Sequence, residues 1–220
     1  MDSECMDNEA ILAGRVLRAS TTGFSIGCQS SIPVGGQPMA REGRPLPEFG
    51  ALVKAPNPAG PLSGISDSVT YGLVYNVTVE DDPFVRQLVA AGVEDEEYIA
   101  DQRQRRQVPV VVDVLVVGYS SGLEVYHRLP PQPPGTLDRI YACNAAELVR
   151  FTERHDWLRI VLAATDVQAD SLLIAALRAA AAARPPDRRE PYLIAAGREL
   201  ARLLAMDLVR LDGILRQLRA

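Results

Sequence analysis

The segment Val108-Pro-Val-Val-Val-Asp-Val-Leu-Val-Val117 is the most constraining part of this 220-residue sequence. Side chains of a β-strand alternate between two faces, so this segment is apolar on both of them. In a closed barrel one of these faces fills the interior, and the other must be covered by further structure. The segment therefore predicts a barrel strand with a second layer packed against its outside.

A second long strand is predicted over residues 69–79, where the apolar pattern has a period of two. We expect one of its faces to carry Val69, Tyr71, Leu73, Tyr75, Val77 and Val79. Shorter strands, separated by loops rich in Gly and Pro, are predicted at 11–18, 24–28, 49–55, 123–129 and 139–143.

After about residue 143 the composition changes to alanine, leucine and arginine. We therefore predict an α+β fold, with a small N-terminal closed antiparallel β-barrel over residues 1–143 and an all-helical C-terminal region over residues 144–220. Between the two long strands, Asp82-Pro83 combines a helix cap with a proline at the first helical position. This pair predicts a helical insertion in the barrel over about residues 82–107.

The helical region opens at Asn144, because Asn144 and Glu147 form a capping-box pattern. Its last helix is predicted to run unbroken from Glu190-Pro191 to about Leu218. The leucines that recur on it at helical spacing are Leu200, Leu204, Leu208, Leu211, Leu215 and Leu218. Such a stripe must be buried, either against the preceding helices or against another subunit. These leucines are the candidate partner interface.

Several kinds of site are excluded by composition. The chain has a single lysine, Lys54, with neither a preceding Gly-rich loop nor a following Ser or Thr, so it has no P-loop ATPase site. Its three cysteines are widely spaced and form no Cys-x-x-Cys pair, so no disulfide framework or zinc knuckle is predicted. We expect no metal and no cofactor.

Charge and hydropathy bear on location and partners. The formal net charge of −5 argues against nucleic-acid binding through overall charge. The N-terminus is acidic, unlike a signal peptide, and no apolar run approaches the roughly 18 residues of a membrane helix. We therefore expect a cytoplasmic protein that does not act at a membrane.

Gly118-Tyr119-Ser120-Ser121-Gly122 matches the Gly-x-Ser-x-Gly motif of serine esterases. That motif requires a helix directly after the serine, whereas here an alternating, strand-like segment follows. We interpret the segment as a hairpin turn and keep an esterase using Ser120 as a remote alternative. The two histidines, His127 and His155, are expected to be structural rather than catalytic or metal-binding.

Two groups of arginines support a different alternative, a barrel that binds nucleic acid through phosphate contacts. They are Arg103, Arg105 and Arg106 in the insertion, and Arg184, Arg188 and Arg189 between two predicted helices. A dipole-completing helix end explains the first group more simply, and a solvated linker explains the second.

Several segments resemble, in the same order, the HAS-barrel family, the small β-barrel at the N-termini of HerA-type DNA translocases and F-type ATP synthase subunits. The segments are Gly14-Arg15-Val16, Phe49-Gly50-Ala51-Leu52-Val53-Lys54, Gly72-Leu73-Val74, Val110–Gly118 followed by Leu129-Pro130-Pro131-Gln132-Pro133-Pro134-Gly135, and Asn144-Ala145-Ala146-Glu147-Leu148. They span about residues 10–150. The resemblance implies a barrel that packs ring subunits together and docks a partner nuclease, and that carries no catalytic residue. In the translocases a RecA-like ATPase follows the barrel, whereas here a helical segment without a P-loop follows it.

We therefore expect a non-enzymatic assembly or accessory protein that acts through protein–protein contacts. Its partner would be a second copy of itself, in a homo-oligomer, or a HerA-like DNA-processing ATPase.

Overall fold

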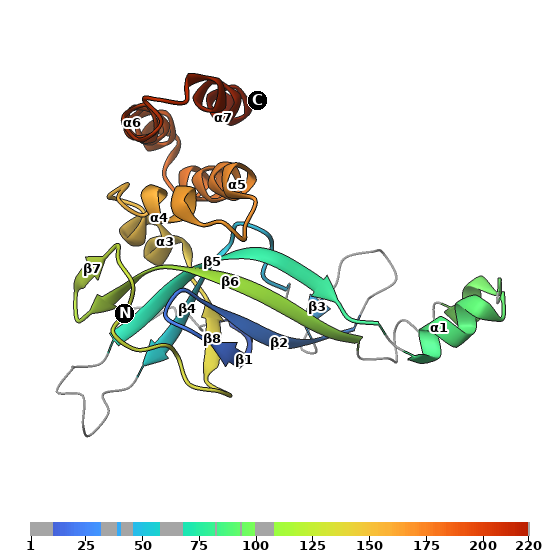
Figure 1. Cartoon of the computed structure of the whole chain (residues 1–220). Coiled ribbons are helices and arrows are strands. Elements are labelled where there is room, and N and C mark those ends of the chain that lie inside the picture. Colours follow the sequence, from blue (N-terminus) through green and yellow to red (C-terminus); the bar gives the residue numbers. More distant parts are fainter. Residues whose placement is uncertain are drawn as a thin grey trace, which may run out of the picture.

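Two long antiparallel strands, β5 (Ser68–Val79) and β6 (Val108–Ser121), form the centre of the sheet (Figure 1). The structure, a computed structural model, describes residues 11–31, 39–40, 46–57, 68–81, 83–92, 94–99 and 108–219.

Four shorter strands complete a closed barrel with β5 and β6. These strands are β1 (Leu12–Ala19), β2 (Gly23–Ser31), β4 (Leu52–Asn57) and β8 (Arg139–Ala142). The order β2-β1-β8-β4-β5-β6 closes because β6 also pairs with β2, from Gly23↔Leu115 to Ser30↔Val108. Two short strands, β3 (Met39–Ala40) and β7 (Glu124–Tyr126), extend the edges by pairing with β2 and β6. The predicted closed antiparallel barrel is confirmed.

Strand β6 is buried on both faces, as its composition predicts. Val110, Val112, Val114 and Val116 lie in the cluster that fills the barrel and are at most 1% exposed. On the outer face, Val117 belongs to a second cluster, which the helices share. Burying one such side chain stabilises the fold by about 1.5–3 kcal/mol, so β6 contributes to two cores at once.

The single apolar face expected on β5 is wrong, because the second of two register shifts with β6, between Val74 and Asn76, leaves Tyr75 as an extra residue on β5. The first shift, between Tyr71 and Gly72, leaves Val117 as an extra residue on β6 instead. Tyr71 and Leu73 face the helices, whereas Val74 lies inside the barrel. Beyond the second shift, Val77 and Val79 lie opposite Val112 and Val110 and so share the inward face of the sheet. A β-bulge puts two residues against one and reverses the alternation from that point on.

The chain after the barrel is helical, as predicted. Its helices are α3 (Ala145–Phe151), α4 (Leu158–Ala163), α5 (Ala169–Ala182), α6 (Pro186–Leu203) and α7 (Leu208–Arg219). Helix α4 contacts β6 and α5 contacts β5, and both α6 and α7 pack on α5 (Figure 1). The helices therefore form the layer that covers the outer face of the barrel.

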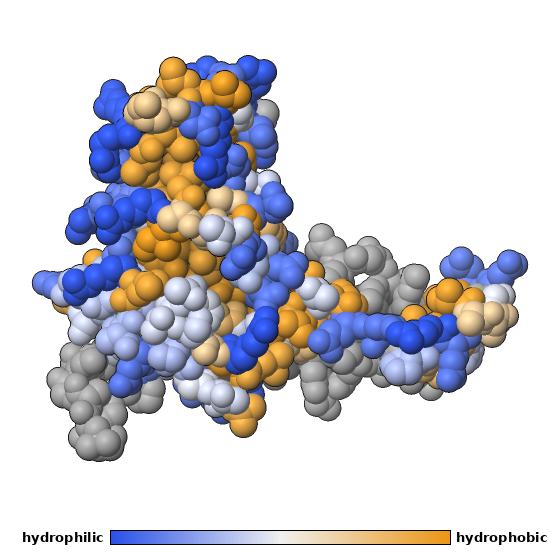
Figure 2. Space-filling view, in the orientation of Figure 1, coloured by the Kyte–Doolittle hydropathy of each residue, from blue (hydrophilic) through white to orange (hydrophobic). Residues whose placement is uncertain are grey.

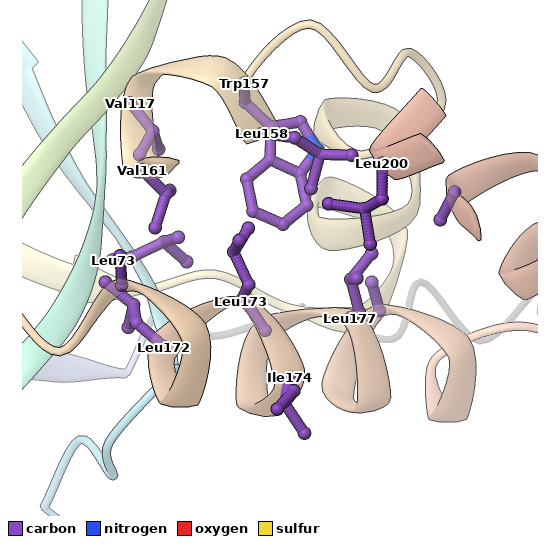
Figure 3. Packing of buried hydrophobic residues seen from close by; sticks show 14 of the residues in the cluster. Leu73, Val117, Trp157, Leu158, Val161, Leu172, Leu173, Ile174, Leu177 and Leu200 are labelled. Carbon is purple, nitrogen blue, oxygen red and sulfur yellow. The ribbon is translucent and has the colours of Figure 1, made fainter. Parts of the chain in front are cut away.

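Trp157 lies at the centre of this second layer, where Leu158, Leu173, Leu177 and Leu200 surround it (Figure 3). The predicted capping box at the start of α3 is confirmed, since the Asn144 side chain accepts from Glu147 N and the Glu147 side chain accepts from Asn144 N. Glu147 also forms an ion pair with Lys54, the single lysine, which joins α3 to β4.

The unbroken final helix is a wrong prediction, since a turn over residues 204–207 separates α6 from α7. Asp207 explains the break, because its Oδ1 accepts a hydrogen bond from Arg210 N at 3.1 Å and caps the new helix. The turn folds α7 back so that α6 and α7 both contact α5.

The predicted insertion begins with α1 (Pro83–Ala90), and residues 96–99 form a further helical turn. The remainder of the predicted segment, residues 100–107, lies outside the described residues. Helix α1 stands away from the barrel, beyond the ends of β5 and β6 (Figure 1).

We expect Gly50→Ala to lower the free energy of unfolding by about 2–4 kcal/mol, measured by urea denaturation. Gly50 has a φ of 84°, and a Cβ there would lie 2.5 Å from the Cβ of Ala175 on α5. The left-handed conformation costs an alanine about 1–2 kcal/mol, and overpacking adds about 1–3 kcal/mol.

Gly122→Ala is the matched control, because Gly122 has a φ of 59° and a Cβ there would meet nothing within 4 Å. Its free energy of unfolding should fall by about 1–2 kcal/mol, which is the cost of the left-handed conformation alone. If the free energy of unfolding fell equally in the two variants, a steric clash with α5 would not contribute to the cost at Gly50.

Candidate functional site

A groove of about 1000 Å³ lies between the barrel and the helical layer. One wall is formed by the end of β1, the β1–β2 turn and β6, and the other by α4 and the loop that leads to α5. Its apolar lining includes Tyr75, Leu115, Ile160, Ala163 and Val167. The groove exists because helices cover one part of the outer face of β6 and leave the neighbouring part open.

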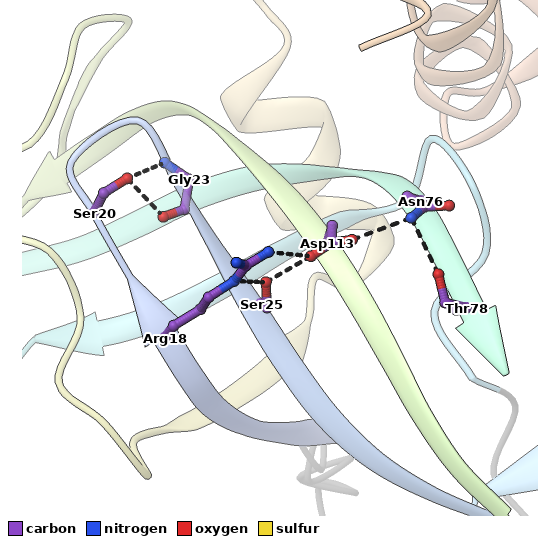
Figure 4. Close-up of polar contacts among 7 residues, drawn as sticks. All are labelled: Arg18, Ser20, Gly23, Ser25, Asn76, Thr78 and Asp113. Atoms are coloured by element: carbon purple, nitrogen blue, oxygen red, sulfur yellow. Dashed lines mark hydrogen bonds and ion pairs between the residues drawn. The ribbon is translucent and has the colours of Figure 1, made fainter. Parts of the chain in front are cut away.

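One end of the groove is held by a chain of polar contacts from β1 to β5 (Figure 4). Arg18 Nε donates to Ser25 Oγ at 3.0 Å, and Ser25 Oγ donates to Asp113 Oδ1 at 2.5 Å. Asn76 Nδ2 donates to Asp113 Oδ2 at 3.1 Å, so Asp113 joins three strands. Arg18 Nη2 lies 3.8 Å from Asp113 Oδ1, and its side chain is largely exposed.

Two further arginines line the groove. Arg128 Nη2 donates to the Tyr119 hydroxyl at 3.0 Å, and its guanidinium lies 4.9 Å from the centre of the Tyr126 ring. The Tyr119 and Tyr126 rings stack with their centres 5.1 Å apart. Arg159, on α4, is exposed and has no ion pair with any residue that the structure describes. The groove therefore combines an apolar floor with exposed guanidinium groups.

His127 closes the floor of the groove and is buried. Its Nε2 lies 2.9 Å from the Phe151 carbonyl oxygen, and its Nδ1 lies 3.8 Å from Asp156 Oδ2. Burial lowers the pKa of His127 below its ordinary value, and the contacts with Phe151 and Asp156 oppose that shift. A neutral ring wedged against Phe151 is consistent with the structural role that we predict for it.

Arg184 is buried between the helices and contacts α3, α5 and α6. Its guanidinium lies 3.6 Å from the centre of the Tyr192 ring, and its Nη1 donates to Thr152 Oγ1 at 3.1 Å and to the Ala180 carbonyl at 2.6 Å. Burial lowers the pKa of Arg184 from its ordinary value. The His155 ring stacks on the Tyr192 ring, and the two ring centres are 5.1 Å apart.

Of the arginines predicted for a nucleic-acid surface, the structure describes Arg184, Arg188 and Arg189. Arg184 is buried, so assigning it to a phosphate contact is wrong. Arg189 donates to the carbonyl oxygens of Arg184 and Ala182 at the end of α5, and Arg188 is exposed, 3.9 Å from Asp187. The first group, Arg103, Arg105 and Arg106 in the insertion, lies outside the described residues.

The leucine stripe is expected to be buried either by the preceding helices or by another subunit. The helices of the same chain bury most of it. Leu200, Leu204 and Leu211 are buried in the helical core, and Leu215 and Leu218 pack partly against it. Leu200, Leu204 and Leu211 are not available to a partner, which corrects the predicted interface at these three positions, whereas Leu215 and Leu218 stay partly exposed. Leu208 is 67% exposed, because the turn before α7 carries it off the stripe.

Ser120 has no esterase geometry. It lies within β6 opposite Val125, and the chain turns at 122–123 into β7, so no helix follows the serine. Ser120 is buried in the strand, 4% exposed. The nucleophile-elbow alternative is wrong, and the hairpin is confirmed, although the serine lies in its strand rather than in its turn.

No metal or thiol site is evident in the described part of the chain. No group of three or more His, Cys, Asp or Glu side chains there could hold a metal ion. Burial raises the pKa of Cys28 to about 11 and raises that of Cys143 as well, so neither thiol ionises at neutral pH. Within the same residues, no helix has the length and hydrophobicity to cross a membrane.

Sequence reasoning missed the groove. Its residues come from β1, β2, β5, β6, α4 and the loops beside them, and no sequence motif connects these segments with one another. The available signal was the excess of apolar residues on the outer face of β6, which indicates that something covers it but not which part stays open.

No protein-family model matches this sequence, and no significant match is found among curated proteins. The resemblance to the HAS-barrel family therefore stays a prediction, although the closed barrel that it implies is present.

We expect the free energy of unfolding to fall as the pH drops from about 6.5 to 5.5. Burial lowers the pKa of His127 and of His155 in the folded protein, so the unfolded chain binds more protons once the pH is below about 6.5. Each histidine can contribute at most about 1.4 kcal/mol per pH unit.

The double variant His127→Gln/His155→Gln should flatten this dependence, measured by urea denaturation at several pH values. Glu199, whose pKa is lowered by its hydrogen bond from Arg202, contributes nearer pH 4.5 and below, outside this window. An unchanged slope in the double variant would mean that other groups titrate there.

Proposed function

We propose that this chain is a non-catalytic assembly or accessory protein that acts through protein–protein contacts. The observation that carries the proposal is an arm, defined as α1 together with the end of β5, residues 76–81. The arm extends from the barrel and ends in a helix whose described side chains are all at least partly exposed.

Helix α1 is amphipathic, with its apolar residues at helical spacing and polar residues between them (Figure 2). Val89 is 76% exposed, and Val79 at the base of the arm is 52% exposed. An ion pair between Arg86 and Asp81 links the helix to the end of β5. Apolar side chains displayed on an extended element are typical of a surface that a partner covers.

The resemblance to the HAS-barrel family supports the same class of function. In that family the barrel packs ring subunits together, and the sequence here has the barrel without a P-loop. We propose as partner a second copy of this chain or a HerA-like DNA-processing ATPase.

Assembly through the arm predicts that Val89→Asp weakens the complex at least about tenfold, because a carboxylate buried in an apolar contact costs at least about 1.4 kcal/mol. Light scattering of the purified chain at tens of micromolar would measure self-assembly. Titration with a purified HerA-like ATPase would measure the other complex.

Leu123→Asp is the matched control, since Leu123 is 86% exposed in the β6–β7 turn, away from the arm. It should leave assembly unchanged. A monomeric wild-type chain that also fails to bind the ATPase would refute the proposal, as would equal effects of the two substitutions.

A further inference from the structure

We propose that the groove between β6 and α4 binds an extended segment of a partner protein in which carboxylates alternate with aliphatic side chains. The inference rests on the proposed function, because it too requires a protein partner, but it uses a different surface from the arm. It follows from the floor of the groove, from its charges and from the separate elements that carry them.

The floor is aliphatic and open to solvent. Leu115 and Ile160 face it from the two walls, Val167 lies at its end, and all three are half-buried. Its volume of about 1000 Å³ is enough for several side chains. Ligand pockets in proteins measure about 300–1000 Å³, so this groove is at the upper end of the range.

The groove is basic although the chain is acidic. Arg18, Arg128 and Arg159 line it against a single lining carboxylate, Asp166, whereas the whole chain has a formal net charge of −5. Two of these arginines, Arg128 and Arg159, form no ion pair with a described residue. Guanidinium groups beside an apolar surface favour a ligand that supplies both carboxylates and aliphatic groups.

The arginines come from separate elements around the groove. Arg18 lies at the end of β1, Arg128 follows β7 and Arg159 lies on α4. A ligand that contacts more than one of them is extended, as a peptide of several residues is, unlike a single phosphate or carboxylate.

Arg128 borders the groove, but its guanidinium is held elsewhere. It rests on the Tyr126 ring and donates to the Tyr119 hydroxyl, on the face of β6 opposite to Leu115. Both edges of β6 are paired, with β2 and with β5, over residues 110–115. A bound peptide therefore cannot pair with β6 as an added strand there, so side chains of the groove must recognise it.

A nucleic acid fits this surface less well. Proteins that bind single strands stack successive bases on several aromatic rings, whereas the described floor is mainly aliphatic, with Tyr75 its partly exposed aromatic residue. The observations therefore favour a peptide over an oligonucleotide.

A random octapeptide display library selected on the full-length chain tests the proposal. We expect the recovered peptides to be enriched in Asp and Glu alternating with Leu, Ile and Val. The best of them, made synthetically, should bind Arg159→Gln about fivefold to tenfold more weakly than the wild type, because one charge-assisted contact is lost. Ala163→Glu, which places a carboxylate in the groove, should weaken binding more than about tenfold.

Arg188→Gln is the matched control, because Arg188 is equally an exposed arginine on a helix but lies outside the groove. It should leave the affinity unchanged. Val89→Asp should also bind the peptide normally, which separates this inference from the proposed role of the arm. If the arm fails to mediate assembly while the acidic peptide still binds, the arm is not the assembly surface, but the groove is still a peptide-binding site.

Three outcomes would overturn the inference. They are recovery of no binding peptide or of basic or uncharged ones, equal weakening by Arg159→Gln and Arg188→Gln, and displacement of the peptide by an oligo-dT strand that binds the same arginines more tightly.

Discussion

The burial of β6 on both faces is the constraint on which the rest of the structure depends. Its inward valines close the barrel through the pairing with β2, and its outward residues require a cover. A barrel alone would leave Val117 and Leu115 in water, so the helices must pack on the same strand that completes the ring. Barrel and helices are therefore coupled through β6, with further contacts from β4 and β5, rather than joined by a linker alone.

Buried polar groups hold that second layer in one arrangement. Arg184 spans α3, α5 and α6 through carbonyl oxygens, Thr152 and the Tyr192 ring, and no described carboxylate forms an ion pair with it. Lys54 and Glu147 tie α3 to β4 in the same way. Each contact satisfies a group whose desolvation would otherwise cost several kcal/mol, so the helices have few alternative positions on the barrel.

The surfaces proposed for partners arise where that cover stops. Helix α4 ends at Ala163, before it reaches the β1–β2 turn, and the groove with its arginines lies in the space left over. At the other end, the sheet continues past the helical layer and carries α1 away from the body (Figure 1). Both features combine apolar area with exposure, which a folded chain otherwise avoids.

Patterns confined to neighbouring residues could be predicted from the sequence by itself: the strand at 108–117, the capping box at Asn144, the turn before β7, and hence the α+β barrel with helices after it. These depend on periodicity and on local hydrogen bonds, which a short segment contains in full. The bulges in β5 and β6, the turn at Asp207, the burial of Arg184 and the groove were decided by tertiary structure. Each of them depends on which residues from distant parts of the chain pack against the segment. In a close-packed interior, the free-energy cost of a cavity or a steric clash is set by those neighbours and not by the segment itself.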